Sequence, residues 1–130
     1  MIQIIQIQYK MKFLKHGNIN NYEPIIEAKV TNGQLPNNSL LSYIPTINVG
    51  KIGDVIESPN GISITVLNIE LQEYQYYISL TQQSGFVNNV ETTSTPNVIL
   101  YSAQNNNSVL LRTSYSTETK KMTLVISQYE

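Results

Sequence analysis

Scarce acid–base residues limit the chemistry that this chain of 130 residues could perform. His16 is its only histidine, Asp54 its only aspartate and Arg112 its only arginine. A serine–histidine–aspartate triad would have to combine His16 with Asp54. The Gly-x-Ser-x-Gly turn that presents the nucleophilic serine of many hydrolases is absent. We interpret His16, which precedes Gly17, as a solvated loop residue.

Carboxylates offer a second possible chemistry, because two of them can together cleave a glycosidic bond. The candidates are Glu57, Glu70, Glu73 and Glu91. Glu70 and Glu73 flank an expected turn, where exposed carboxylates are ordinary. The sequence lacks the closely spaced carboxylates of a calcium loop, glycine-rich phosphate motifs and any cysteine. We therefore expect a protein that is not an enzyme, with no catalytic residue, no metal and no cofactor.

A cluster of tyrosines is the most distinctive set of side chains. Tyr74, Tyr76 and Tyr77 each combine an apolar ring with a polar tip, which suits sugar stacking and protein interfaces. In a strand, Tyr74 and Tyr76 would share one face and Tyr77 would point to the other. Alternatively, one face is core and the other is ordinary surface. We predict a possible interaction surface here, next to residues 82–96, which are expected to form a functional loop.

Apolar and polar residues alternate along most of the chain, which predicts β-strands. The segments with this pattern are residues 5–13, 24–30, 40–49 (where Pro45 indicates an edge strand or a bend), 54–58, 62–66, 74–80, 97–103, 109–115 and 122–126. The clearest hairpin reverses at Pro59, Asn60 and Gly61. Near Leu67 the apolar residues change face, which predicts a bulge or bend.

The pattern indicates one all-β domain over residues 1–130. Eight or nine short strands with turn residues between them favour a single antiparallel β-sandwich, either jelly-roll or immunoglobulin-like. No segment of ten residues has the apolar stripe of a helix. Scarce alanine (two residues) also argues against long helices.

Charge is sparse and balanced, with eight basic and nine acidic residues. A nucleic-acid partner is not expected, because such proteins usually carry a basic stripe. The sequence contains no run of about 18 apolar residues, so we expect no membrane span. The surface is instead rich in Asn, Gln, Ser and Thr (15, 10, 12 and 11 residues). An uncharged coat fits a surface that meets other proteins, although AT-rich codon usage would also favour Asn.

Two resemblances follow from these features. The Asn/Gln/Ser/Thr-rich loops, the alternating strand from Ile5 to Phe13 and the lack of cysteine or a signal peptide resemble small all-β structural proteins of virions, from archaeal viruses or phages. The hairpin GDVIESPNGISITVLNIE, residues 53–70, is similar to one hairpin of immunoglobulin-like sandwiches on bacterial surface proteins. The first resemblance implies a virion or cytoplasmic location, and secretion would require a signal peptide that has been removed.

Two functions remain open from the sequence. The first is a structural or assembly protein of a virion or other particle, which acts through protein–protein contacts with its own copies or with the particle. The amphipathic segment at residues 2–14 could pair with a neighbour's sheet edge or within its own sheet. The second is a module that binds a glycan or another cell-surface ligand through Tyr74, Tyr76 or Tyr77 and residues 82–96.

Overall fold

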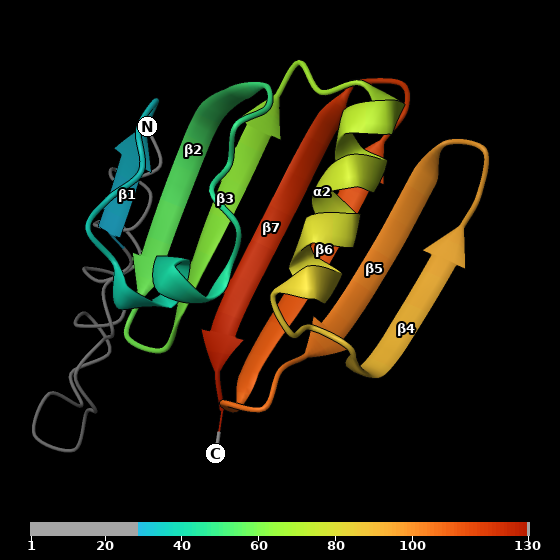
Figure 1. Cartoon of the computed structure of the whole chain (residues 1–130). Coiled ribbons are helices and arrows are strands. Elements are labelled where there is room, and N and C mark those ends of the chain that lie inside the picture. Colours follow the sequence, from blue (N-terminus) through green and yellow to red (C-terminus); the bar gives the residue numbers. More distant parts are fainter. Residues whose placement is uncertain (1–28, 130) are drawn as a thin grey trace, which may run out of the picture.

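The computed structural model describes residues 29–129, which form one antiparallel sheet and one α-helix (Figure 1). The seven strands lie in the order β1-β2-β3-β7-β6-β5-β4. The strand expected at residues 5–13, most of the strand expected at 24–30, and His16 lie outside the described residues.

The elements follow one another along the chain in two groups of strands separated by the helix. Their bounds are β1 Lys29–Asn32, the 3-10 helix η2 Ser39–Tyr43, β2 Lys51–Ser58, β3 Gly61–Leu67, α2 Leu71–Gln83, β4 Asn88–Ser94, β5 Val98–Gln104, β6 Val109–Ser116 and β7 Lys121–Gln128.

Tight turns connect neighbouring strands where the sequence predicts them. The hairpin of β2 and β3 reverses at Pro59 and Asn60, as expected. Between β5 and β6, the side chain of Asn105 accepts hydrogen bonds from the backbone N–H groups of Asn107 and Val109. In a turn, the backbone N–H groups have no neighbouring strand to bond, and an asparagine side chain can accept their hydrogen bonds instead. The expected strands at 97–103, 109–115 and 122–126 are confirmed as β5, β6 and β7.

The last strand joins the two groups of strands into one sheet. β7 pairs with its neighbour in sequence, β6, and also with β3, which lies more than fifty residues earlier. In the second pairing, Ile62 lies opposite Ile126 and Ile64 opposite Leu124. All four side chains are buried. The centre of the sheet therefore depends on contacts between distant parts of the sequence.

The helix α2 replaces the strand expected at residues 74–80, so that prediction was wrong. The side chain of Glu73 accepts a hydrogen bond from the backbone N–H of Glu70, which starts the helix. Gly85 ends it in a conformation with φ of 106°, which favours glycine. The tyrosine-rich sequence fits both the two-residue period of a strand and the period of about 3.6 residues of a helix. Packing decides for the helix, because Tyr74 and Tyr77, three residues apart, are buried together.

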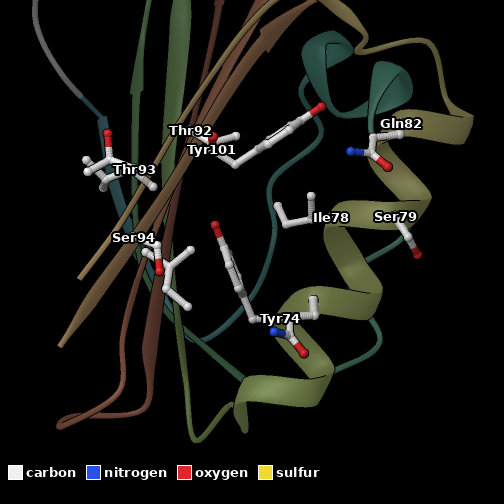
Figure 2. A pocket seen from close by; sticks show the side chains of 11 residues that line it. Tyr74, Ile78, Ser79, Gln82, Thr92, Thr93, Ser94 and Tyr101 are labelled. Carbon is white, nitrogen blue, oxygen red and sulfur yellow. The ribbon is translucent and has the colours of Figure 1, made fainter. Parts of the chain in front are cut away.

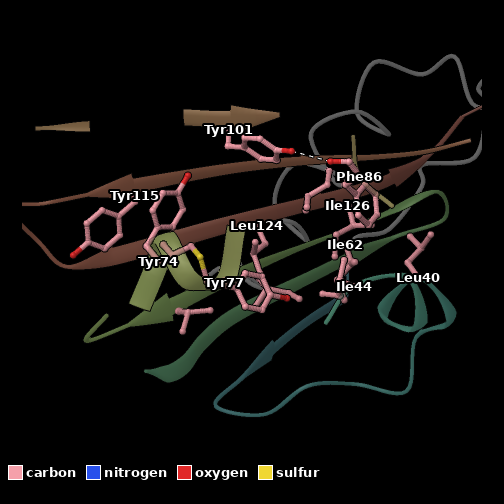
Figure 3. Packing of buried hydrophobic residues seen from close by; sticks show 14 of the residues in the cluster. Leu40, Ile44, Ile62, Tyr74, Tyr77, Phe86, Tyr101, Tyr115, Leu124 and Ile126 are labelled. Carbon is pink, nitrogen blue, oxygen red and sulfur yellow. Dashed lines mark hydrogen bonds between the residues drawn. The ribbon is translucent and has the colours of Figure 1, made fainter. Parts of the chain in front are cut away.

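One face of the sheet carries both covering elements, so the molecule has two layers (Figure 1). The helix α2 lies in front of β6 and β7, while η2 and the loop around it lie in front of β2 and β3. Figure 3 shows the core between these layers, where Tyr74 and Tyr77 approach Leu124 from the helix. The antiparallel β character is confirmed. The expected sandwich of eight or nine strands is not, because the described residues contain a single open sheet.

Two other local predictions need correction. Residues 40–49, expected as an edge strand or a bend, contain no strand: η2 ends at Tyr43, and the chain bends at Ile44, just before Pro45. The expected loop at 82–96 contains the strand β4. The bulge or bend expected near Leu67 is confirmed as a bend: β3 ends at Leu67, and the chain bends at Asn68, which takes a left-handed conformation with φ of 60°. The face of the apolar residues changes because the strand stops there.

Buried tyrosine hydroxyls tie the loops and the helix together. Tyr115 in β6 donates a hydrogen bond to the backbone oxygen of Ile69, just before α2 (2.6 Å). Tyr77 in α2 donates one to the backbone oxygen of Pro45, in the loop that covers β2 and β3 (2.7 Å). The second bond therefore connects the two elements that cover the sheet. No helix among residues 29–129 has the length and apolar character needed to cross a membrane.

The hydrogen bond between Tyr77 and Pro45 can be tested by removing one hydroxyl. We expect Tyr77→Phe to lower the free energy of unfolding by about 1 to 2 kcal/mol, because the partly buried oxygen of Pro45 loses its donor. Urea denaturation followed by circular dichroism measures this. Tyr76→Phe is the matched control, since Tyr76 is 62% exposed and should change stability little. Equal stability of the two variants would contradict the assignment.

Burial also makes the stability depend on alkaline pH. It raises the pKa of the Tyr77 hydroxyl above its ordinary value of 10.0, because the phenolate would lose its hydration. The stability linked to the neutral hydroxyl is fully present below the unfolded pKa and is lost as the pH rises through the raised pKa. We expect the urea midpoint to fall above about pH 10 more steeply in the native chain than in Tyr77→Phe. If the urea midpoints of the native chain and of Tyr77→Phe fell equally steeply with pH, this linkage would be ruled out.

Candidate interaction site

A groove lies between the helix α2 and the strands β4 and β5 (Figure 2). Its volume is about 260 Å³. The helix supplies one wall and the two strands supply the other. The lining residues are Tyr74, Gln75, Ile78, Ser79, Gln82, Thr92, Thr93, Ser94, Ile99, Leu100 and Tyr101.

The groove has an apolar interior and a neutral polar rim. Ile78 of α2 and Ile99 of β5 contribute apolar side chains and pack against the core. Gln75, Ser79 and Gln82 follow the helix along its edge. None of the lining residues is charged. The groove can therefore offer van der Waals contact and uncharged hydrogen bonds, but no ion pair from its own lining.

The tyrosines singled out from the sequence are divided between core and surface. Tyr74 and Tyr77 are each 1% exposed, whereas Tyr76 is 62% exposed. The expectation that Tyr74 and Tyr76 share a face was wrong, because the segment is helical. Tyr74 still lines the groove, whereas Tyr76 and Tyr77 are absent from its lining.

Tyr74 is held in a fixed position at the base of the groove. Its ring stacks on that of Tyr115, with centroids 5.0 Å apart and planes 16° from parallel. Its hydroxyl shares a hydrogen bond with that of Thr113 (2.8 Å). Burial raises its pKa, while the bond to Thr113 opposes that rise. The Tyr74 hydroxyl therefore stays neutral near physiological pH and serves packing.

The strand β4 forms one edge of the sheet beside the groove. It pairs only with β5 among the described strands, and six of its seven residues are exposed. The backbone N–H of Thr95 donates to the oxygen of Val98, on the β5 side (2.9 Å). Because such bonds alternate along antiparallel strands, Thr92 and Ser94 direct their N–H and C=O groups away from β5.

Exposed apolar side chains gather at the same end of the sheet. Val87 and Val90 are 55% and 45% exposed, and Val98 and Leu100 of β5 are 39% and 42% exposed. Glu91 is the only charged residue within the two strands. Soluble proteins usually protect a sheet edge with lysine or proline, and neither occurs within β4.

The candidate carboxylates of the sequence are dispersed over the fold. Glu70 contacts Lys120 (3.1 Å) and Glu73 caps the helix. Glu57 accepts a hydrogen bond from Asn38, and Asp54 accepts one from Asn32. Within residues 29–129, no three His, Cys, Asp or Glu side chains gather to form a metal-binding cluster.

Sequence reasoning placed Tyr74 and the segment 82–96, which contains Thr92 and Ser94, in one predicted binding surface, and residues of both line the groove. It missed Ile78 and Ile99 as lining residues. The signal that could have found Ile78 is Glu70 followed by Glu73, a pair that starts a helix. In a helix, Ile78 lies one turn after Tyr74 on the same face.

Comparison of the chain with protein-family models, with curated proteins and with solved structures gives no match. The candidate site is therefore defined by its own geometry: an uncharged groove beside an exposed sheet edge.

Proposed function

We propose that this chain is a non-enzymatic structural protein of a virion or another particle, and that it acts through protein–protein contacts. The observation that supports this function is the exposed, charge-poor end of the sheet at β4 and β5. Val90, Val98 and Leu100 are exposed on these two adjoining strands, which carry one charged residue, and Val87 is exposed just before β4.

Contact with another protein would relieve two costs at this end of the sheet. Burying the exposed valine and leucine side chains would stabilise the complex by about 25 cal/mol for each Å² of apolar surface removed from water. The unpaired backbone groups of an edge strand gain hydrogen-bond partners. The low charge helps, because charged groups at the centre of an interface must lose their hydration.

The proposed role predicts that the chain assembles. Light scattering of the purified chain over a range of concentrations should give a mass above that of the 14.7 kDa monomer. In a sucrose gradient of native lysate, the chain should sediment with particles. A strictly monomeric chain that also remains at the top of the gradient would contradict the proposal.

The groove favours a second candidate function, the binding of a neutral glycan. Its apolar interior and uncharged rim of Gln75, Ser79 and Gln82 match a ligand with C–H faces and many hydroxyls. Tyr76, which the sequence suggested for this role, lies outside the groove, so the ligand would contact the side chains of α2, β4 and β5 instead.

Two tryptophan substitutions separate a groove ligand from general surface binding. Thr92 lines the groove and pairs with Tyr101, which is buried on the helix side. Thr119 lies on the exposed turn between β6 and β7, outside the groove. We expect Thr92→Trp to fill the groove and to abolish binding on a glycan array. Thr119→Trp, whose side chain lies outside the groove, should keep it. Absence of glycan binding by the native chain would reject this candidate.

A further inference from the structure

We propose that two copies of the chain join through their β4 strands, which pair antiparallel about a two-fold axis that passes beside Thr93. The inference rests on the proposed function and deepens it by naming the partner and the register. The partner surface is then identical to the surface it meets, as the isologous interface of a symmetric dimer requires.

The backbone of β4 fixes which residues can pair. Thr92 and Ser94 direct their N–H and C=O groups away from β5, as the bond between Thr95 and Val98 determines. In the proposed register, Thr92 of one copy lies opposite Ser94 of the other, and the reverse pair follows by symmetry. Each pair exchanges both of its backbone hydrogen bonds, so every outward group of these residues is satisfied.

Neighbouring registers satisfy fewer groups. Centring the axis on Ser94 places Thr92 opposite Pro96, which has no N–H to donate. Centring it on Thr92 places Ser94 opposite Val90, inside the irregular part of β4 between Asn88 and Glu91. The register centred on Thr93 uses only the regular part of the strand.

Side-chain chemistry also agrees with this register. Thr93 lies opposite its own copy, and threonine pairs across antiparallel strands are favourable. Glu91, the only charge on the strand, lies opposite Thr95 of the partner and not opposite another Glu91. No like charges therefore face each other across the new pairing.

The two-fold axis stands perpendicular to the joined sheet, so rotation keeps each helix on the same face. The α2 helices of the two copies then flank the paired β4 strands, with the two grooves opening toward each other over that face. Their rims would form one uncharged channel across the dimer. The proposed dimer thus uses both features of the candidate site.

A single cysteine at Thr93 tests the register directly, because the native chain contains no cysteine. Residues that face each other without hydrogen bonds between them have Cα atoms about 4.5 Å apart, which lies within disulfide range. We expect Thr93→Cys to give a covalent dimer under mild oxidation. Thr119→Cys, on the exposed turn between β6 and β7, is the matched control and should form no covalent dimer at the same concentration.

Placing a charged residue at position 93 tests the two-fold axis. Thr93→Lys and Thr93→Glu each place like charges directly opposite each other, so each variant alone should lose the dimer in light scattering. An equimolar mixture should recover the dimer, with one Thr93→Lys chain and one Thr93→Glu chain in each.

A proline at position 92 tests the outward backbone hydrogen bonds. Thr92→Pro removes an outward N–H without removing a bond to β5, and should also be monomeric, whereas Thr92→Ala should dimerise. Circular dichroism checks that each variant folds.

The possible failures are distinguishable. A native chain that assembles, with Thr93→Cys cross-linking no faster than Thr119→Cys and the charged variants unaffected, would overturn the β4 pairing and leave the proposed function intact. A native chain that is monomeric in solution but sediments with particles would also overturn it. A chain that neither self-associates nor joins particles would overturn both.

Discussion

The width of the sheet relative to one helix is the constraint on which the rest of this structure depends. Seven strands at the usual spacing extend roughly 29 Å from the first to the last, whereas a helix with its side chains is about 10 Å across. The single helix α2 can therefore cover only the middle of one face. The 3-10 segment η2 and its loop cover the part over β2 and β3. The edge strand β4 keeps no such cover among the described elements, and the groove lies between it and the helix.

The buried hydroxyl groups make this partial covering stable. Tyr77 reaches from the helix to the oxygen of Pro45, and Tyr115 reaches from the sheet to that of Ile69. A third bond, from Tyr101 of β5 to the oxygen of Phe86, holds the chain just after the helix against the sheet (2.8 Å). Each tyrosine buries a large ring and also satisfies a loop carbonyl that would otherwise be costly to bury. Hydrogen bonds from these tyrosines thus hold irregular backbone in place in a chain that has no cysteine for a disulfide.

The sequence predicted the parts of the fold that depend on local pattern. The hairpin at Pro59 and Asn60 and the strands β5 to β7 have a clear period of two, bounded by turn residues, and these predictions were correct. The helix was missed because tyrosine suits either structure, and Tyr74, Tyr76 and Ile78 alternate as well as Tyr74, Tyr77 and Thr81 repeat. Only tertiary contact with Thr113 and Tyr115 decides the matter. The sandwich was inferred from strand number alone, which does not say what covers each face.

Position in the sheet explains why residues 82–96 were singled out from the sequence as a functional loop but not as an edge strand. Thr92 and Ser94 belong to a stretch of hydroxyl residues that reads as a loop, because its apolar alternation is weak. That weakness is itself a consequence of position: an edge strand beyond the helix buries little on either face, so it needs no apolar stripe. The residues that form the sheet edge and groove rim are therefore the ones with the least pattern. A strand of threonine and serine keeps high β propensity without a core to face, and it can leave its outer backbone groups available for a partner.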